Sequence, residues 1–247
     1  MTSPLWAVLL CLAPGTDGVR LELSTAVARL DFPQDAPLWS EIGAGIGWRM
    51  RDRWATLSAN GVRRWDLDDR QAEVRLGFSP VESLAWEGQA SLGQQERFLP
   101  TWSAGTALSK TFAGGWVGTL GGKVSDYRGW QVVLARGLVE RYIRSFRLGA
   151  GMAGSGASGA DPGMDWRILA GWDWSDVGGI ALDLSHAREL ERLDEGIVER
   201  ISNSATLSAR QGIGSRLTVR PALSWTRLEG IHDRWEARLG VECGLGS

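Results

Sequence analysis

The sequence has no apolar run of about 20 residues, which excludes a transmembrane helix. It also lacks an excess of positive charge, since 27 Lys and Arg stand against 29 Asp and Glu without a basic stripe. That balance argues against nucleic acid as a partner. With two histidines and two cysteines, the chain has no set of such ligands at the spacing of a metal site, so we expect no metal and no cofactor.

Two cysteines also leave little scope for disulfides. Cys11 lies in the apolar segment 5–13, which has the length of the core of a signal peptide. We predict a signal peptide over residues 1–18 and a mature domain over 19–247, although no Lys or Arg precedes the segment. A buried first strand is the alternative. Once the signal peptide is removed, Cys243 stands alone and forms no intramolecular disulfide.

What the sequence does contain is a two-residue alternation that runs from Val19 to Ser247, with turns every dozen or so residues. In the last segment the apolar set is Trp235, Ala237, Leu239, Val241, Cys243 and Leu245. Alternate side chains of a strand lie on opposite faces, so this segment has one apolar and one polar face. A chain made almost wholly of such segments, with 14 Trp and 33 Gly, is typical of a transmembrane β-barrel.

We therefore predict an all-β fold, a single up-and-down antiparallel β-barrel of about 14 strands. Twelve strands are the alternative, because the alternation is blurred in 54–66 and 130–139. The predicted strands are residues 19–32, 39–50, 54–66, 70–79, 83–94, 102–112, 115–126, 130–139, 142–153, 164–174, 179–188, 196–210, 215–227 and 234–246.

The connections between these strands predict an orientation. Every connection longer than five residues falls at one end of the barrel: 33–38, 95–101, 154–163, 189–195 and 228–233. Bacterial barrels have short periplasmic turns and longer outer loops, so we expect both termini in the periplasm and the barrel in the outer membrane. Aromatic residues are expected to form a girdle at each end. Trp48, Trp54, Phe112, Trp116, Trp172 and Trp174 would form one, and Trp39, Trp65, Trp102, Trp130, Trp166, Trp225 and Trp235 the other.

The face opposite the apolar side chains would line the lumen. Its charged candidates are Glu73, Arg75, Glu87, Lys123, Arg147, Arg167, Asp173, Asp183, Arg220, Arg238 and Glu242. Because both signs are present, we expect many of these residues to form ion pairs across the interior and to block the lumen in part. Charges left without a partner would set the ion preference of a pore.

His186 is the residue that could indicate an enzyme. It shares the outward face with Glu199 and Asn203, a combination that suggests a lipid hydrolase. Such chemistry also needs a nucleophile that the histidine can reach, and Ser185 and Ser202 are predicted to point inward. We therefore expect no catalytic residues. The charged run 188–195 could form a short helical cap, or simply a solvated loop.

Four short motifs in the middle of the chain resemble the YaiO-type family of outer-membrane β-barrels. They are Phe98-Leu99-Pro100-Thr101-Trp102, Gly114-Gly115-Trp116, Asp126-Tyr127-Arg128 and Val139-Glu140-Arg141-Tyr142, and the likeness covers residues 70–153. The resemblance implies a barrel of a Gram-negative outer membrane and carries over no catalytic residues. Barrels of this kind often end in an aromatic residue, which the assembly machinery reads, whereas this sequence ends Leu245-Gly246-Ser247.

From these observations we expect a non-enzymatic barrel that conducts or binds a polar or glycan ligand, in line with surface-polysaccharide functions in the family. One alternative is a lipid or lipopolysaccharide hydrolase that uses His186. The other is a structural barrel with a plugged lumen. The expected partners are outer-membrane lipid, lipopolysaccharide and the barrel-assembly machinery, with a glycan as ligand.

Overall fold

The computed structural model describes residues 18–31, 38–64, 67–94, 99–157, 162–193, 196–229 and 232–245, and gives no side-chain positions for 189–200 and 232. Fourteen strands account for nearly all of this part of the chain. They are β1 (Gly18–Leu30), β2 (Leu38–Met50), β3 (Arg53–Arg64), β4 (Leu67–Val81), β5 (Leu84–Gln94), β6 (Trp102–Phe112), β7 (Trp116–Asp126), β8 (Gln131–Ile143), β9 (Phe146–Ala157), β10 (Gly163–Ser175), β11 (Gly178–Leu193), β12 (Gly196–Ile213), β13 (Leu217–Leu228) and β14 (His232–Leu245), with a short 3-10 turn η1 (Ala113–Gly115).

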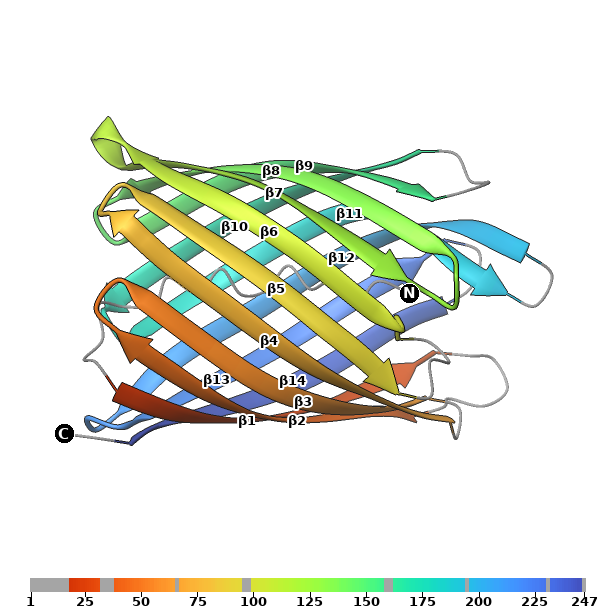
Figure 1. The fold of residues 1–247 in the computed structure, drawn as a ribbon, viewed down its shortest axis with the longest axis horizontal. Helices are drawn as coiled ribbons and strands as arrows, with labels where there is room; N and C mark the ends of the chain where they lie inside the picture. The colour runs from red at the N-terminus through yellow and green to blue at the C-terminus, as the bar shows by residue number, and fades with distance from the viewer. Residues whose placement is uncertain are drawn as a thin grey trace.

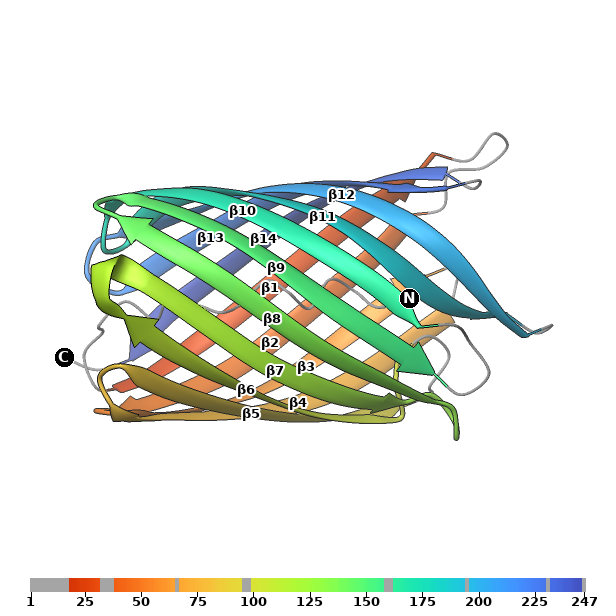
Figure 2. The ribbon, with the colours of Figure 1, turned by 90° about the horizontal axis from the view of Figure 1, so that it is seen from above.

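The strands form one closed antiparallel barrel in sequence order (Figures 1 and 2). Closure is made by β1 and β14, which pair from Val19 with Leu245 to Leu30 with Arg234. Every strand thus has a neighbour on both sides, so its backbone N–H and C=O groups are satisfied within the wall. The predicted all-β barrel of 14 strands is confirmed.

The two ends of the barrel differ in their connections. At one end, which we call the turn end, the connections 51–52, 82–83, 113–115, 144–145, 176–177 and 214–216 have two or three residues each. Gly18 and Leu245 also lie there, at the left of Figure 1. The opposite, loop end carries longer connections, including 31–37 and 95–101. Which end faces the cell exterior stays a prediction.

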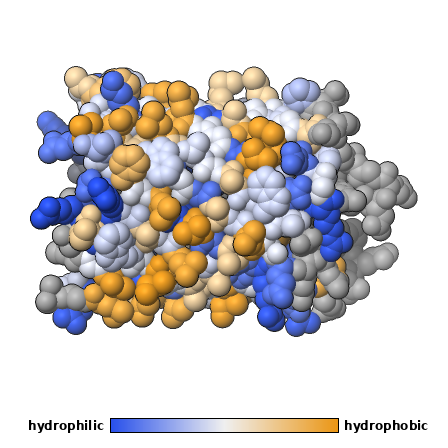
Figure 3. Space-filling view, viewed as in Figure 1, coloured by the Kyte–Doolittle hydropathy of each residue, from blue (hydrophilic) through white to orange (hydrophobic). Residues whose placement is uncertain are grey.

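The outer face of the wall is apolar. Its most exposed large side chains include Leu120 at 72%, Ile42 at 70% and Leu92 at 69%. Figure 3 shows hydrophobic residues between two ends where hydrophilic residues gather. Exposure of this kind is unfavourable in water and favourable in lipid. Among the described residues, no helix is long and apolar enough to cross a membrane.

Several predicted boundaries are wrong. The turn expected at 140–141 lies at 144–145, because β8 continues to Ile143 and its Glu140 and Arg141 pair with β7. Arg144 takes a positive φ of 56° in this turn without a glycine to announce it. Residues 67–69 belong to β4, and residues 189–193 continue β11 in register with β12 rather than forming a loop or a helical cap.

The predicted aromatic girdles also need two corrections. Trp48, Trp116 and Trp172 are exposed on the outer face, as expected. Trp39 and Trp54 instead lie on the inner face, because Trp39 pairs with inward Ala28 and Trp54 with inward Gly77. Trp65 and residues 1–17, which include almost all of the predicted signal peptide, lie outside the described residues.

Candidate functional site

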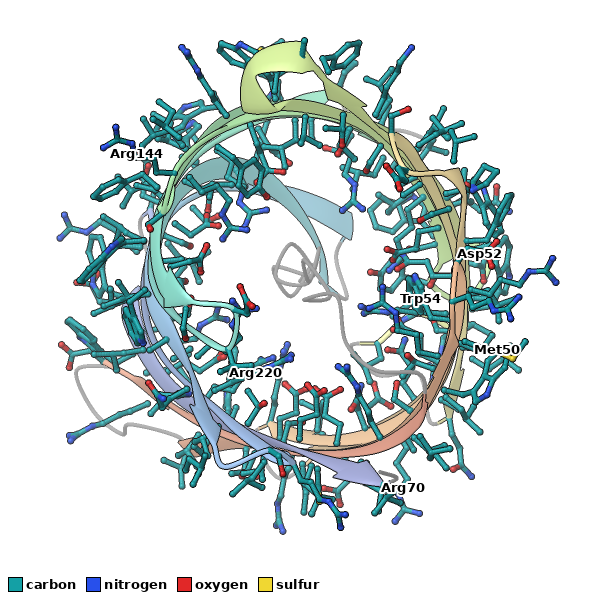
Figure 4. The ribbon with its side chains drawn as sticks, turned by 90° about the vertical axis from the view of Figure 1, so that its left-hand side faces the viewer. Met50, Asp52, Trp54, Arg70, Arg144 and Arg220 are labelled. Carbon is teal, nitrogen blue, oxygen red and sulfur yellow. The ribbon has the colours of Figure 1, made fainter. Side chains whose placement is uncertain are left out.

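The lumen is the place where charged and polar side chains gather. All eleven charged residues predicted for the lumen lie on the strand face opposite the exposed apolar side chains. Figure 4 looks along the barrel from the turn end and shows Arg220 on the inner side of the wall, whereas Met50 and Arg144 lie on the outer side. Period-two alternation is thus a sufficient guide to which side chains reach the interior.

Two ion-pair triads join the strands on either side of the closure. Glu242 on β14 lies between two arginines, 2.7 Å from Arg20 on β1 and 2.5 Å from Arg220 on β13. Arg238, further along β14, lies 3.3 Å from Glu41 and 3.1 Å from Glu236. In the first triad one carboxylate is shared by two guanidinium groups, and in the second one guanidinium is shared by two carboxylates. Side chains as well as backbone hydrogen bonds therefore link the strands around the closure.

Further pairs lie around the rest of the wall. They are Glu73 with Arg75, Arg167 with Asp183, Asp173 with Arg210 at 3.5 Å, and Arg147 with Glu140 at 4.0 Å. Nine of the eleven predicted residues therefore take part in ion pairs, and Glu87 and Lys123 do not within the described part of the chain. The alternation had also placed Glu236 on this face, whereas the partners Arg20, Glu41, Glu140 and Arg210 were not predicted, although each shares the inward phase of its strand.

Long inward side chains lie along the wall, over glycines. A Cβ added at Gly171 would come 3.4 Å from Arg147 Nε, and one at Gly105 would come 3.0 Å from Gln89 Nε2. A Cβ added at Gly121 would likewise come 3.3 Å from Arg136 Nε. Because glycine has no side chain, a neighbour can rest against its backbone. The glycine content of the strands therefore keeps charged side chains close to the wall.

Rows of hydroxyl groups line other sectors of the lumen. On β5 and β6, Ser91 and Ser103 are 2.7 Å apart, and Ser91 also accepts a hydrogen bond from Gln71 at 3.1 Å. On β12 and β13, Ser204 bonds Thr226 at 3.0 Å and Thr206 bonds Ser224 at 2.9 Å. These small, internally satisfied groups give an uncharged polar surface between the charged clusters.

The motifs that resemble the YaiO-type family meet in space. At the loop end, Thr101 N donates to Asp126 O at 2.8 Å, and Arg128 N donates to Thr101 Oγ1 at 3.2 Å. Leu99 N donates to the carboxylate of the fully buried Asp69 at 2.9 Å. Burial raises the pKa of Tyr127, which lies between Asp126 and Arg128 in the third motif, to about 12. The first and third motifs thus hold the connections after β5 and β7 together.

The other two motifs meet at the turn end. Trp116 pairs with Arg141 across β7 and β8, and the guanidinium carbon lies 5.0 Å from the centre of the indole ring. Gly115, with φ of +76°, approaches Tyr142 so closely that a Cβ would come 2.4 Å from its carbonyl oxygen. All four motifs therefore shape the ends of β6, β7 and β8, and none of these contacts forms a catalytic site.

His186 lies on the outer face, as predicted. Its Nδ1 lies 2.9 Å from Asn203 Oδ1, and its ring stacks on Trp166 with 5.7 Å between centres. Ser185 and Ser202 pair with inward residues, so neither reaches the histidine. The side chains of Glu199 and His232 lie outside the described residues. In that described part of the chain, no group of three or more His, Cys, Asp or Glu could hold a metal ion.

Comparison with known proteins gives likeness in structure alone. No family model and no curated protein matches the sequence. A bacterial polysaccharide outer membrane secretin matches with a TM-score of 0.60 and 10% identity, over 93% of this chain and 99% of that one. An outer membrane channel from Pseudomonas putida F1 matches with a TM-score of 0.61 and 8% identity, over 93% and 96%.

OpdQ from Pseudomonas aeruginosa matches with a TM-score of 0.52 and 11% identity, over 93% of this chain and 98% of that one. These alignments span almost the whole of each barrel, so the likeness concerns the complete fold. The apolar outer face, in turn, is what a barrel in a membrane needs. The chain has the fold of a bacterial outer-membrane β-barrel, and the outer membrane is its location.

Proposed function

We propose that this barrel is a non-enzymatic conduit for polar solutes. The observation that carries the proposal is the arrangement of the inner wall: its long charged side chains are paired with one another or lie over glycines such as Gly121 and Gly171. A structural barrel whose lumen is filled by its own wall side chains would need side chains that cross the interior and interlock. Charges held along the wall leave room for a hydrated solute beside them.

A glycan is the ligand class that we propose. Rows of hydroxyl groups and paired charges suit a ligand that is polar and hydrogen-bonding along its whole length. Two further observations support this choice. One similar structure is described as a polysaccharide outer membrane secretin, and the four motifs of residues 98–142 support membership of the YaiO-type family.

Conductance tests the proposal most directly. The full mature chain, refolded and inserted into a planar bilayer, should give discrete ion currents in simple salt. Retarded migration of the unheated protein on a denaturing gel would show that the barrel has folded. A folded barrel that inserts and gives no current would overturn the conduit in favour of the structural barrel.

The ion pairs predict how the conductance would change. Replacing Arg167 and Arg220 together by Gln removes two positive charges and leaves Asp183 without its partner. Fixed charges near a pore attract ions of opposite sign, so the pore should become more cation-selective. The reversal potential in a salt gradient measures this. An unchanged reversal potential would show that these charges do not lie along the permeation path.

The hydrolase is the second candidate function, and the hydrogen bond between His186 and Asn203 is the observation in its favour. His186→Ala should leave conductance unchanged, because the residue lies on the outer face. If instead the unmodified protein cleaves lipid or lipopolysaccharide and His186→Ala does not, the enzyme replaces the conduit as the better proposal.

A further inference from the structure

An inward tryptophan stands at the turn end of the lumen. Trp54 is the second residue of β3, just after the 51–52 turn. Figure 4 shows it on the inner side of the wall, while Met50 before the turn lies outside. In the hydrogen-bonded register, Trp54 is flanked by Arg49 on β2 and Gly77 on β4, and Gly77 is followed by Glu87 on β5.

The indole of Trp54 occupies the space that a side chain at position 77 would need. A Cβ built on Gly77 would come 2.3 Å from both Cε2 and Nε1 of the indole. Glycine at 77 thus allows the ring to lie against β4 rather than across the lumen. The residue remains partly exposed, and among the described residues its indole N–H has no hydrogen-bond partner.

Glu87 supplies an acceptor beside this ring. Its side chain is partly exposed and makes no hydrogen bond or ion pair with any described residue. It interacts with Arg75 and Arg136 at longer range, and Arg75 is already paired with Glu73. Glu87 lies two strands from Trp54, a separation of about 10 Å between Cα atoms at the usual strand spacing. Because the indole crosses that separation by lying over Gly77, its lumen-facing surface is brought towards Glu87, and a sugar packed on that surface would be within reach of the carboxylate.

We propose that Trp54 and Glu87 form a subsite for an uncharged hexopyranose residue of a glycan. The C–H face of a pyranose packs on an aromatic ring, which is apolar in the same way as the sugar face. The sugar hydroxyls donate hydrogen bonds to Glu87, and a bond to an ionised acceptor is stronger than a neutral one. A carboxylate at this place disfavours uronic acids. The subsite deepens the proposed conduit and rests on it for the source of the ligand.

Trp48 provides a matched control. It lies on β2, on the other side of the same turn, and is 44% exposed on the outer face. Replacing Trp48 or Trp54 by Ala removes the same ring from the same end of the barrel, but only Trp54 is within reach of a solute in the lumen. Glu87→Gln keeps the size of the side chain and removes its charge.

Calorimetric titration of the refolded full chain in detergent, with a neutral glucose hexasaccharide, tests the subsite. Trp54→Ala should weaken binding about tenfold, the upper range for an aromatic contact. Glu87→Gln should weaken it less, Trp48→Ala should not change it, and a uronate hexasaccharide should bind more weakly than the neutral one. Gly77→Ala should also weaken binding, because it displaces a ring that is still present.

The outcomes separate the subsite from the conduit. If the hexasaccharide does not bind, or binds equally to Trp54→Ala and the unmodified protein, the subsite is wrong even if the barrel conducts ions. If Trp54→Ala and Gly77→Ala both weaken binding while the barrel gives no current, the subsite stands and the conduit is wrong. Each variant is first tested for folding by its gel migration, so loss of structure is not read as loss of binding.

Discussion

Two tryptophans point into the lumen from opposite ends of the barrel, and their surroundings differ. Trp39, at the loop end, is 4% exposed and belongs to a buried cluster with Ala28 and Leu30. The guanidinium carbons of Arg64 and Arg234 lie 4.5 Å and 5.6 Å from the centre of a ring of its indole. The loop end therefore uses its inward tryptophan for packing.

Trp54, at the turn end, has no such cover among the described residues. Its ring rests on Gly77 and remains partly exposed. The two residues have the same chemistry and the same inward phase, and their roles differ because their neighbours differ. Burial under two cations stabilises the wall, whereas support by a glycine leaves an aromatic surface for a ligand. This contrast predicts different responses at the two ends.

The largest difference is expected in stability. Trp39→Ala should lower the free energy of unfolding by about 3–5 kcal/mol, the cost of emptying a well-packed site. Trp54→Ala should cost about 1 kcal/mol or less, because little of its surface packs against protein. Reversible denaturant unfolding in lipid vesicles measures both. Equal losses would show that the two tryptophans are packed alike, and would remove the contrast.

The assignment of inner and outer faces predicts the next effect. Leu120 lies near the middle of β7 and faces outward, and Leu76 does the same on β4. Arginine at either position should destabilise the barrel by about 2–4 kcal/mol, because the charge would face lipid. Arginine at Gly121 should also destabilise the barrel, but there the cause would be steric, since a Cβ would come 2.8 Å from Thr106 O.

Alanine separates these two causes. Leu120→Ala should be far milder than Leu120→Arg, whereas at Gly121 alanine should already carry much of the penalty. The free energies of unfolding of the four variants in vesicles decide between them. A Leu120→Arg barrel as stable as the unmodified one would argue that this face does not meet lipid.

Tyr127 predicts an alkaline limit at the loop end. Because its pKa is raised from about 10 to about 12, the phenol is favoured over the phenolate in the folded state. Its contribution is complete below pH 10 and is lost as the pH rises through 12, about 3 kcal/mol in all. The ultraviolet absorbance of phenolate should show a step near pH 12. Tyr127→Phe should remove this step, and a Tyr127 step near pH 10 would contradict the burial.

The prediction with the smallest effect on the protein concerns the orientation of the barrel, which cysteine labelling can test. In a variant without Cys243, a cysteine at Glu229, at the loop end, should react with an impermeant reagent on intact cells, and one at Asp176, at the turn end, should not. Both residues are exposed and acidic, so they are matched in exposure and charge. Reaction at 176 alone would reverse the orientation, and would place the proposed sugar subsite near the outside of the cell. Ser158, in the predicted 154–163 loop, lies outside the described residues.

Much of the fold could be predicted because the side chains of a β-strand alternate with a period of two residues. The alternation of Trp235 to Leu245 is visible without any knowledge of its neighbours, and the same rule placed all eleven charged candidates on the inner face. The end of β8 was missed for a local reason. Its turn uses Arg144 at a positive φ where a glycine would have been recognisable, and the charged residues Glu140 and Arg141 looked like the break.

The sequence by itself indicated about 14 strands, the face on which each charged candidate lies and the short connections at one end of the barrel, because these depend on residues next to each other in the chain. Only the tertiary structure decided that Glu242 is shared by two arginines. The same holds for two findings on the part of the chain that the structure describes: Glu87 has no ion-pair partner there, and Trp39 is covered while Trp54 is not. Those facts depend on the register between strands, which brings together residues such as Arg20 and Glu242 from opposite ends of the chain. A period of two excludes a slip by one residue but does not choose among registers that differ by an even number of residues.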